Sequence, residues 1–281
     1  MNRSHVLFVV ALLALPGAGG VRAQHVDVMP VSVVGDPNLI ETGAFDFDGF
    51  SVTALPPQRV YENDLEEPIP GADLLAGEAG VTALSATAAA SLLAGTGYTN
   101  LPGGVDLRFD FNAFSLGGRP AANLWYWDGV DDNGDGDYAD DISFAPAAGT
   151  TLTFETSGGA FSASVDGGAL PVPGFVIDTT LLDNPGTMDD ETGFLHVDMD
   201  ALLDDGDSDP ATGLALGVYA LALTLSYNPQ SEPIFWVFNG GLGEEGELAV
   251  EAAVAFVPEP SAAMVLIGSA ALLAWRRRRP H

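Results

Sequence analysis

The chain has 281 residues, with 39 acidic residues against nine basic ones, all of them arginine, and it contains no cysteine. Between Gln24 and Val257 there are 38 acids and three arginines, which argues against binding to nucleic acid or to anionic membrane surfaces, because phosphate neutralisation needs Lys and Arg. The lack of cysteine excludes disulfides and thiolate metal sites, while 47% apolar residues are enough to bury a core.

The first 23 residues have the pattern of a secretory signal peptide. Arg3 precedes an apolar run from Val6 to Leu15, and Val21-Arg22-Ala23 places small or apolar residues before a cleavage site. As an N-terminal anchor the run is too short, since it spans about 15 Å of a hydrocarbon core of about 30 Å. We therefore expect export, with cleavage by signal peptidase after Ala23.

Residues 24–257 predict an all-β, extracytoplasmic domain. Short apolar or alternating runs bounded by Gly, Pro, Asn and Asp recur along this region, and Leu107, Phe109 and Phe111 form the clearest period of two. Such a series of short strands favours a β-sandwich or jelly-roll-like fold, either as one domain or as two lobes that meet near 119–121. The predicted strands are 26–34, 45–52, 105–114, 124–127, 150–156, 161–165, 175–178, 194–199, 218–227, 234–238 and 248–257.

One segment departs from the strand pattern. Residues 81–94 are rich in Ala and Leu, contain no Pro and end at Gly95. This composition predicts one short helix that packs on the sheet, with Gly95 at its C-terminal cap.

The run Asp131-Asp132-Asn133-Gly134-Asp135-Gly136-Asp137 has the pattern of a calcium loop. Oxygen-bearing side chains alternate, and glycines stand where the backbone turns. The seven residues resemble the calcium-binding repeats of dockerins, but Ile142 occupies the position of the final acid. Asp140 and Asp141 precede it as substitutes. The expected Ca²⁺ ligands are Asp131, Asn133, Asp135, Asp137 and Asp141.

A weaker second cluster alternates Asp205, Asp207 and Asp209. Without a cation, either cluster holds like charges close together, which costs free energy. The alternatives are a solvated acidic loop between strands and a general acidic surface adapted to salt.

Enzyme motifs are missing. The sequence contains no H-E-x-x-H, G-x-S-x-G or phosphate-loop pattern and no lysine for a Schiff base. His196 and Asp198 share one face of a predicted strand, as a structural histidine or as a metal pair. A carboxylate pair for glycoside hydrolysis cannot be recognised among so many acids. We expect a non-catalytic protein.

Aromatic residues cluster in 125–127 and 235–238. On short apolar strands such residues fill a core. The alternative is a sugar-stacking platform of a carbohydrate-binding module, which would need Trp125 and Trp127 on an exposed flat face.

The C-terminus joins three features. Pro258-Glu259-Pro260 precedes an apolar stretch, 262–275, which is followed by Arg276, Arg277, Arg278 and Arg279. The stretch spans about 21 Å, which is short for a permanent transmembrane segment. By the positive-inside rule the arginines stay cytoplasmic and the bulk of the chain lies outside.

These residues, 258–281, resemble the PEP-CTERM sorting signal. The resemblance implies recognition by an exosortase, cleavage near the motif and transient anchoring in the membrane. It implies delivery to the cell envelope or an exopolysaccharide matrix and says nothing of catalysis. We expect a secreted envelope or matrix protein that calcium stabilises; the alternatives are a carbohydrate-binding module and a polysaccharide hydrolase.

Overall fold

The computed structural model describes residues 26–46, 51–68, 74–102, 106–156, 161–177, 194–206, 216–227, 230–242 and 246–257. The predicted signal peptide, the tail 258–281 and the ligand candidates Asp207 and Asp209 lie outside these residues. Within them, no helix is long and apolar enough to cross a membrane.

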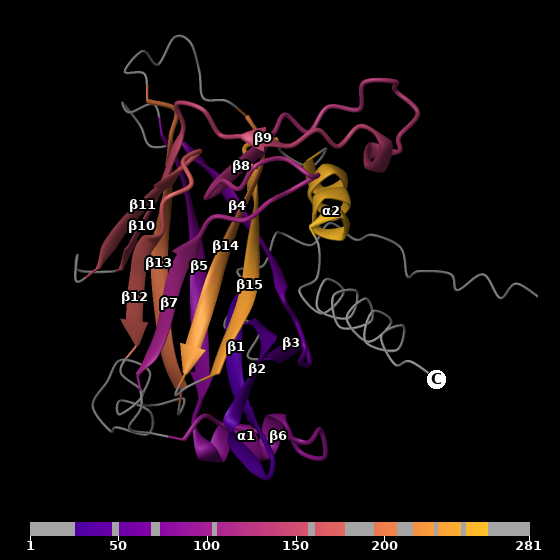
Figure 1. Cartoon of the computed structure of the whole chain (residues 1–281). Helices are drawn as coiled ribbons and strands as arrows, with labels where there is room; N and C mark the ends of the chain where they lie inside the picture. Colours follow the sequence, from indigo (N-terminus) through magenta and orange to yellow (C-terminus); the bar gives the residue numbers. More distant parts are fainter. Residues whose placement is uncertain are drawn as a thin grey trace, which may run out of the picture.

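The predicted all-β class is confirmed, because fifteen strands make up most of the described chain (Figure 1). The strands are β1 (Val26–Val33), β2 (Asp36–Asp46), β3 (Ser51–Ala54), β4 (Val60–Pro68), β5 (Leu74–Leu84), β6 (Tyr98–Thr99), β7 (Leu107–Asn112), β8 (Leu124–Trp127), β9 (Ala145–Pro146), β10 (Thr151–Thr156), β11 (Ser162–Asp166), β12 (Val172–Ile177), β13 (Phe194–Asp204), β14 (Gly217–Tyr227) and β15 (Gln230–Gly240). The helices are α1 (Ala86–Leu92), the 3₁₀ turn η1 (Tyr138–Asp140) and α2 (Gly246–Phe256).

The strands pair into one continuous sheet. Its main path runs β11-β10-β13-β5-β4-β15-β14-β7-β12, and the sheet curls so that its end strands β11 and β12 pack against each other (Figure 1). Phe161 and Phe175 meet at this seam, with ring centroids 5.3 Å apart. A sandwich has two separate sheets, whereas here a single curled sheet supplies the opposing walls of the core.

The interior of the curled sheet is filled by aromatic and aliphatic side chains. Phe154 on β10 lies 5.1 Å from Phe111 on β7 and 5.5 Å from Trp236 on β15, measured between ring centroids. The predicted alternation on β7 is confirmed, since Leu107, Phe109 and Phe111 are buried. Period-two patterning therefore identifies the wall residues of this core.

Strand β14 is central, as its apolar character on both faces predicts. It pairs with β15 along one edge and with β7 and β8 along the other. Leu221, Leu223 and Leu225 face the main core, while Val218 and Ala220 belong to a second apolar cluster on the outer face.

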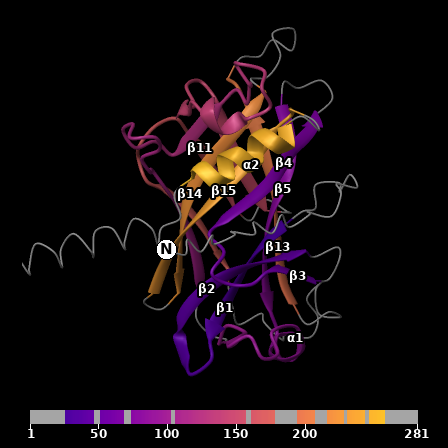
Figure 2. The same ribbon diagram turned by 90° about the vertical axis from the view of Figure 1, so that its right-hand side faces the viewer.

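Helix α2 covers this outer face, lying across β14, β15 and β4 (Figure 2). The sequence predicts a strand over 248–257, and that prediction is wrong. The buried residues Ala249, Val250 and Ala253 recur at the three-to-four-residue spacing of a helix, and Val257 continues the stripe. Short apolar runs suit a strand or a helix, and here packing on the outer face selects the helix.

The predicted helix over 81–94 is shorter than expected. Residues 81–84 end strand β5, and α1 begins only after Ser85, whose hydroxyl accepts a hydrogen bond from the Ala88 N–H. Leu84 and Ala89 pack with Met29 of β1 in a third apolar cluster. Pairing with β13 along the whole of β5 keeps residues 81–84 extended.

The first hundred residues hold more strand than the sequence predicts. β4 and β5 lack a clear alternation, and β2 and β3 flank residues 47–50 in place of one strand over 45–52. Strands that precede residues 119–121 in the sequence pair with strands that follow them, since β4 pairs with β15 and β5 with β13. The described sheet is therefore undivided at that point.

Candidate functional site

The acidic loop that the sequence singles out connects β8 to β9 and lies on the surface. The Asp131 carboxylate accepts hydrogen bonds from the N–H groups of Gly134 and Gly136, at 2.6 and 2.7 Å. These bonds, that from Gly136 above all, lower the pKa of Asp131. Gly134 and Gly136 have φ of 72° and 83°, a left-handed backbone that favours glycine. The two glycines thus let the loop wrap around Asp131.

The remaining candidate ligands continue this wrapping. Asn133 Oδ1 accepts from the Asp135 N–H at 2.9 Å, and Asp135 Oδ1 accepts from the Asp137 N–H at 2.8 Å. Asp141 Oδ2 accepts from the Asp132 N–H at 3.0 Å, so it returns to the start of the loop. Partial burial and the neighbouring Asp140 raise the pKa of Asp141. The loop therefore brings its first and last acids together.

The second acidic cluster is described only in part. Asp205 directly follows β13, and Asp207 and Asp209 lie outside the described residues. Calcium at this cluster and at the 131–141 loop stays a prediction.

A third group of metal-ligating side chains comes from strands far apart in the sequence. Asp27 on β1 and His196 and Asp198 on β13 place one ligand atom each within 4.8 Å of one another. His196 Nε2 lies 3.0 Å from Asp27 Oδ2 and 2.9 Å from Asp198 Oδ1. Burial lowers the pKa of His196, but hydrogen bonds to Asp198 and Asp27 outweigh it and raise the pKa to about 10.

Two of the three members of this group are recognisable in the sequence. His196 and Asp198 share a strand face, which their spacing predicts, but Asp27 sits in the first strand and carries no local signal. Thr82 on β5 donates its hydroxyl hydrogen to Asp27 Oδ2 and so orients the buried carboxylate. Sheet pairing alone brings these strands together.

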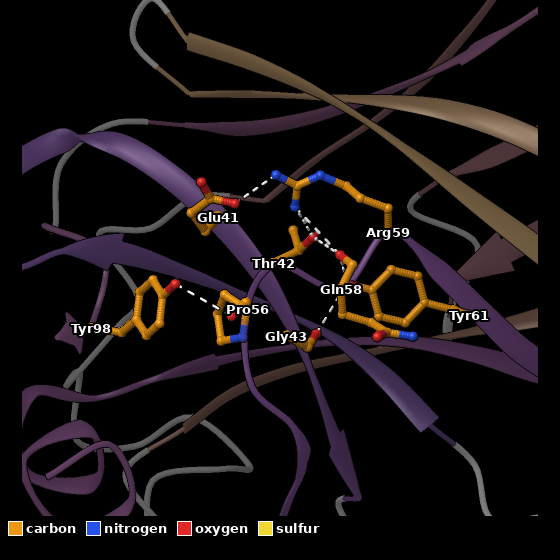
Figure 3. Close-up of polar contacts among 8 residues, drawn as sticks. All are labelled: Glu41, Thr42, Gly43, Pro56, Gln58, Arg59, Tyr61 and Tyr98. Carbon is orange, nitrogen blue, oxygen red and sulfur yellow. Dashed lines mark hydrogen bonds and ion pairs between the residues drawn. The ribbon is translucent and has the colours of Figure 1, made fainter. Parts of the chain in front are cut away.

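A polar network joins β2 to the start of β4 (Figure 3). Arg59 donates to Glu41 Oε2 at 2.6 Å and to Thr42 Oγ1 at 2.7 Å. Burial raises the pKa of Tyr61, whose hydroxyl lies 3.0 Å from the carbonyl oxygens of Gly43 and Gln58. The Arg59 side chain is only 9% exposed, so this ion pair is a structural feature of the fold.

Carboxylates gather where α2 crosses β4. Burial, and then the charges of Asp64, Glu251 and Glu247, raise the pKa of Glu62 to about 7. A folded-state pKa above the ordinary 4.5 means that the folded protein binds this proton more tightly than the unfolded chain. Its stabilising effect is complete below pH 4.5 and is lost as pH rises through about 7.

We expect Glu62→Gln to stabilise the protein above pH 7 by about 1 kcal/mol, because the exposure of Glu62 to water screens part of the repulsion. The difference from wild type should vanish below pH 4.5, where the Glu62 carboxyl is protonated in both the folded and the unfolded chain. Urea unfolding at a series of pH values measures this, with the exposed Asp106→Asn as control. Equal stability of Glu62→Gln and wild type above pH 7 would contradict the raised pKa.

The aromatic runs belong to the core. Trp125, Trp127, Trp236 and Phe238 are all buried, and Trp125 donates its indole N–H to the carbonyl of Phe114 at 3.1 Å. The expectation that they fill a core is confirmed. A sugar-stacking platform made of these tryptophans is thereby excluded in the described fold.

The comparisons with known proteins identify the C-terminal segment. Residues 256–279 match the model of the PEP-CTERM protein-sorting motif. A search of curated proteins gave no match to the chain. The motif marks an exported protein that an exosortase processes after transient anchoring in the membrane. It begins at Phe256, the last residue of α2, so the sorting segment follows the folded domain directly.

Proposed function

We propose that this chain is a non-catalytic protein of the cell envelope or the exopolysaccharide matrix. The observation that carries the proposal is the sorting motif at 256–279, directly after the last helix of a β-sheet domain. In this proposal residues 1–23 direct export, signal peptidase cuts after Ala23, and an exosortase removes the tail. The large aromatic side chains serve packing, which supports a structural role.

Fractionation of the producing cells tests this role. We expect the chain in the envelope or matrix fraction, and we expect its deletion to reduce matrix cohesion without loss of any hydrolytic activity. A glycan array and a reducing-sugar assay on the secreted form test the two alternative functions. Binding of one defined glycan would favour a carbohydrate-binding module, and release of reducing sugar would favour a hydrolase.

We further propose that Ca²⁺ binds the 131–141 loop and stabilises the exported domain. Support comes from the left-handed glycines, the inward-turned Asp131 and the return of Asp141 to the loop start. The net charge of −30 adds to the attraction for a divalent cation.

Calorimetric titration and thermal unfolding measure calcium binding. For an extracellular module with a Kd of about 10⁻⁴–10⁻³ M, about 10 mM Ca²⁺ should stabilise the fold by about 1.4–2.7 kcal/mol. Asp135→Ala should abolish both the heat and the stabilisation. Asp132→Ala is the matched control, since Asp132 lies between the alternating candidate ligands and is not one of them. Absence of heat in the wild type would refute the proposal.

A further inference from the structure

The group Asp27, His196 and Asp198 is built by three neighbouring strands. β13 pairs with β5 so that Asp198 lies opposite Gly80 and His196 opposite Thr82. β1 joins the other edge of β5, where Val28 pairs with Val81 and Asp27 is therefore next to Gly80. Gly80 carries no side chain, so the acids on its two sides can approach each other across β5.

The charges of this group are compatible with a bound divalent cation. The Asp27 side chain is completely buried, and that of His196 is 7% exposed. Burial of a carboxylate is costly unless an opposite charge compensates it. One protonated imidazole leaves two carboxylates half neutralised, whereas a divalent cation with a neutral imidazole neutralises them fully.

The ligand atoms are close to the geometry of a metal site. Neighbouring ligand atoms around a tetrahedral zinc ion are about 3.4 Å apart, given metal–ligand distances of about 2.1 Å. The two distances from His196 Nε2 are 2.9 and 3.0 Å, so small side-chain rotations open the required space. Thr82 donates a hydrogen bond to Asp27, as residues around metal sites commonly do to the metal ligands. The Asp198 side chain is 42% exposed, which provides a path for entry.

We infer that Asp27, His196 and Asp198 bind a divalent transition-metal ion of the zinc class, which joins β1 to β13. An imidazole nitrogen favours this class over Ca²⁺, which takes oxygen ligands. Three protein ligands leave a fourth position for water. The chain contains no cysteine, and such an ion would cross-link β1 to β13 in the way that a disulfide cross-links two strands.

Calorimetric titration of the metal-stripped full chain with Zn²⁺ tests this site. Excess Ca²⁺ fills oxygen-only sites, and Zn²⁺ displaces the imidazole proton as it binds. We expect one Zn²⁺ per chain and a higher melting temperature that a chelator reverses. Asp198→Asn and His196→Gln should each weaken the affinity at least about 10-fold. Asp200→Asn, an exposed acid on the same strand, should bind as wild type.

Co²⁺ gives a second readout, because its visible absorption reports nitrogen and oxygen coordination. We expect this absorption in the wild type and in Asp200→Asn, and its loss in His196→Gln. Two results would overturn the inference: a wild-type chain that binds no stoichiometric Zn²⁺, or Asp198→Asn and His196→Gln variants that bind Zn²⁺ as tightly as the wild type. The three side chains would then form an ion-pair group only. Neither result bears on the proposed matrix role.

Discussion

Replacement of Pro258-Glu259-Pro260 by three alanines is expected to leave the exported chain uncut and held in the membrane fraction. The exosortase recognises the sorting motif, and the apolar stretch 262–275 with its four arginines then keeps the uncut chain anchored. The loss of the released form should be nearly complete, because no second copy of the motif occurs in the sequence. Immunoblots of membrane and culture fractions measure it.

The control for this experiment is Glu251→Ala, which removes an exposed acid from α2 just before the motif. This variant should be processed like the wild type. Normal release of the triple-alanine variant would show that the 256–279 match does not direct processing. A chain truncated after Val257 lacks the sorting segment, so it should be released without cleavage by an exosortase.

Replacement of Arg59 by Met is expected to destabilise the fold by about 2–3 kcal/mol. Arg59 donates to Glu41 and Thr42, and its loss leaves the Glu41 carboxylate without this partner in a largely buried position (Figure 3). The estimate lies below the about 3–5 kcal/mol of a fully buried pair, because the Glu41 side chain is still 23% exposed. Urea unfolding measures the change.

Two further variants test whether the cost of Arg59→Met comes from breaking a buried ion pair. Arg108→Met breaks the ion pair with Asp110, whose side chains are 50% and 30% exposed, and should cost less than about 1 kcal/mol. Glu41→Gln combined with Arg59→Met should recover part of the loss, because the unpaired charge is then gone. Equal costs for Arg59→Met and Arg108→Met would show that burial does not strengthen the Arg59 pair.

Prediction succeeded where the signal is local. The alternation of β7 and the doubly apolar β14 identified the wall and the centre of the sheet. In the acidic loop, Gly134 and Gly136 make the turns that their spacing predicts, whereas calcium binding there stays a prediction. The prediction of a strand over 248–257 failed because its signal is not local. Residues 248–256 belong to helix α2, because the outer face of β14 and β15 is apolar, and the sequence does not reveal that face.

The sequence by itself determined that this protein is exported, since the sorting tail is read from contiguous residues. It also determined the all-β class, since strand alternation is visible over a few residues. Only the tertiary structure decided that one curled sheet encloses the core and that Asp27 lies beside His196. The physical reason is that strand pairing depends on contacts between distant segments. No sequence pattern within β1 or β13 predicts that these two strands pair with opposite edges of β5.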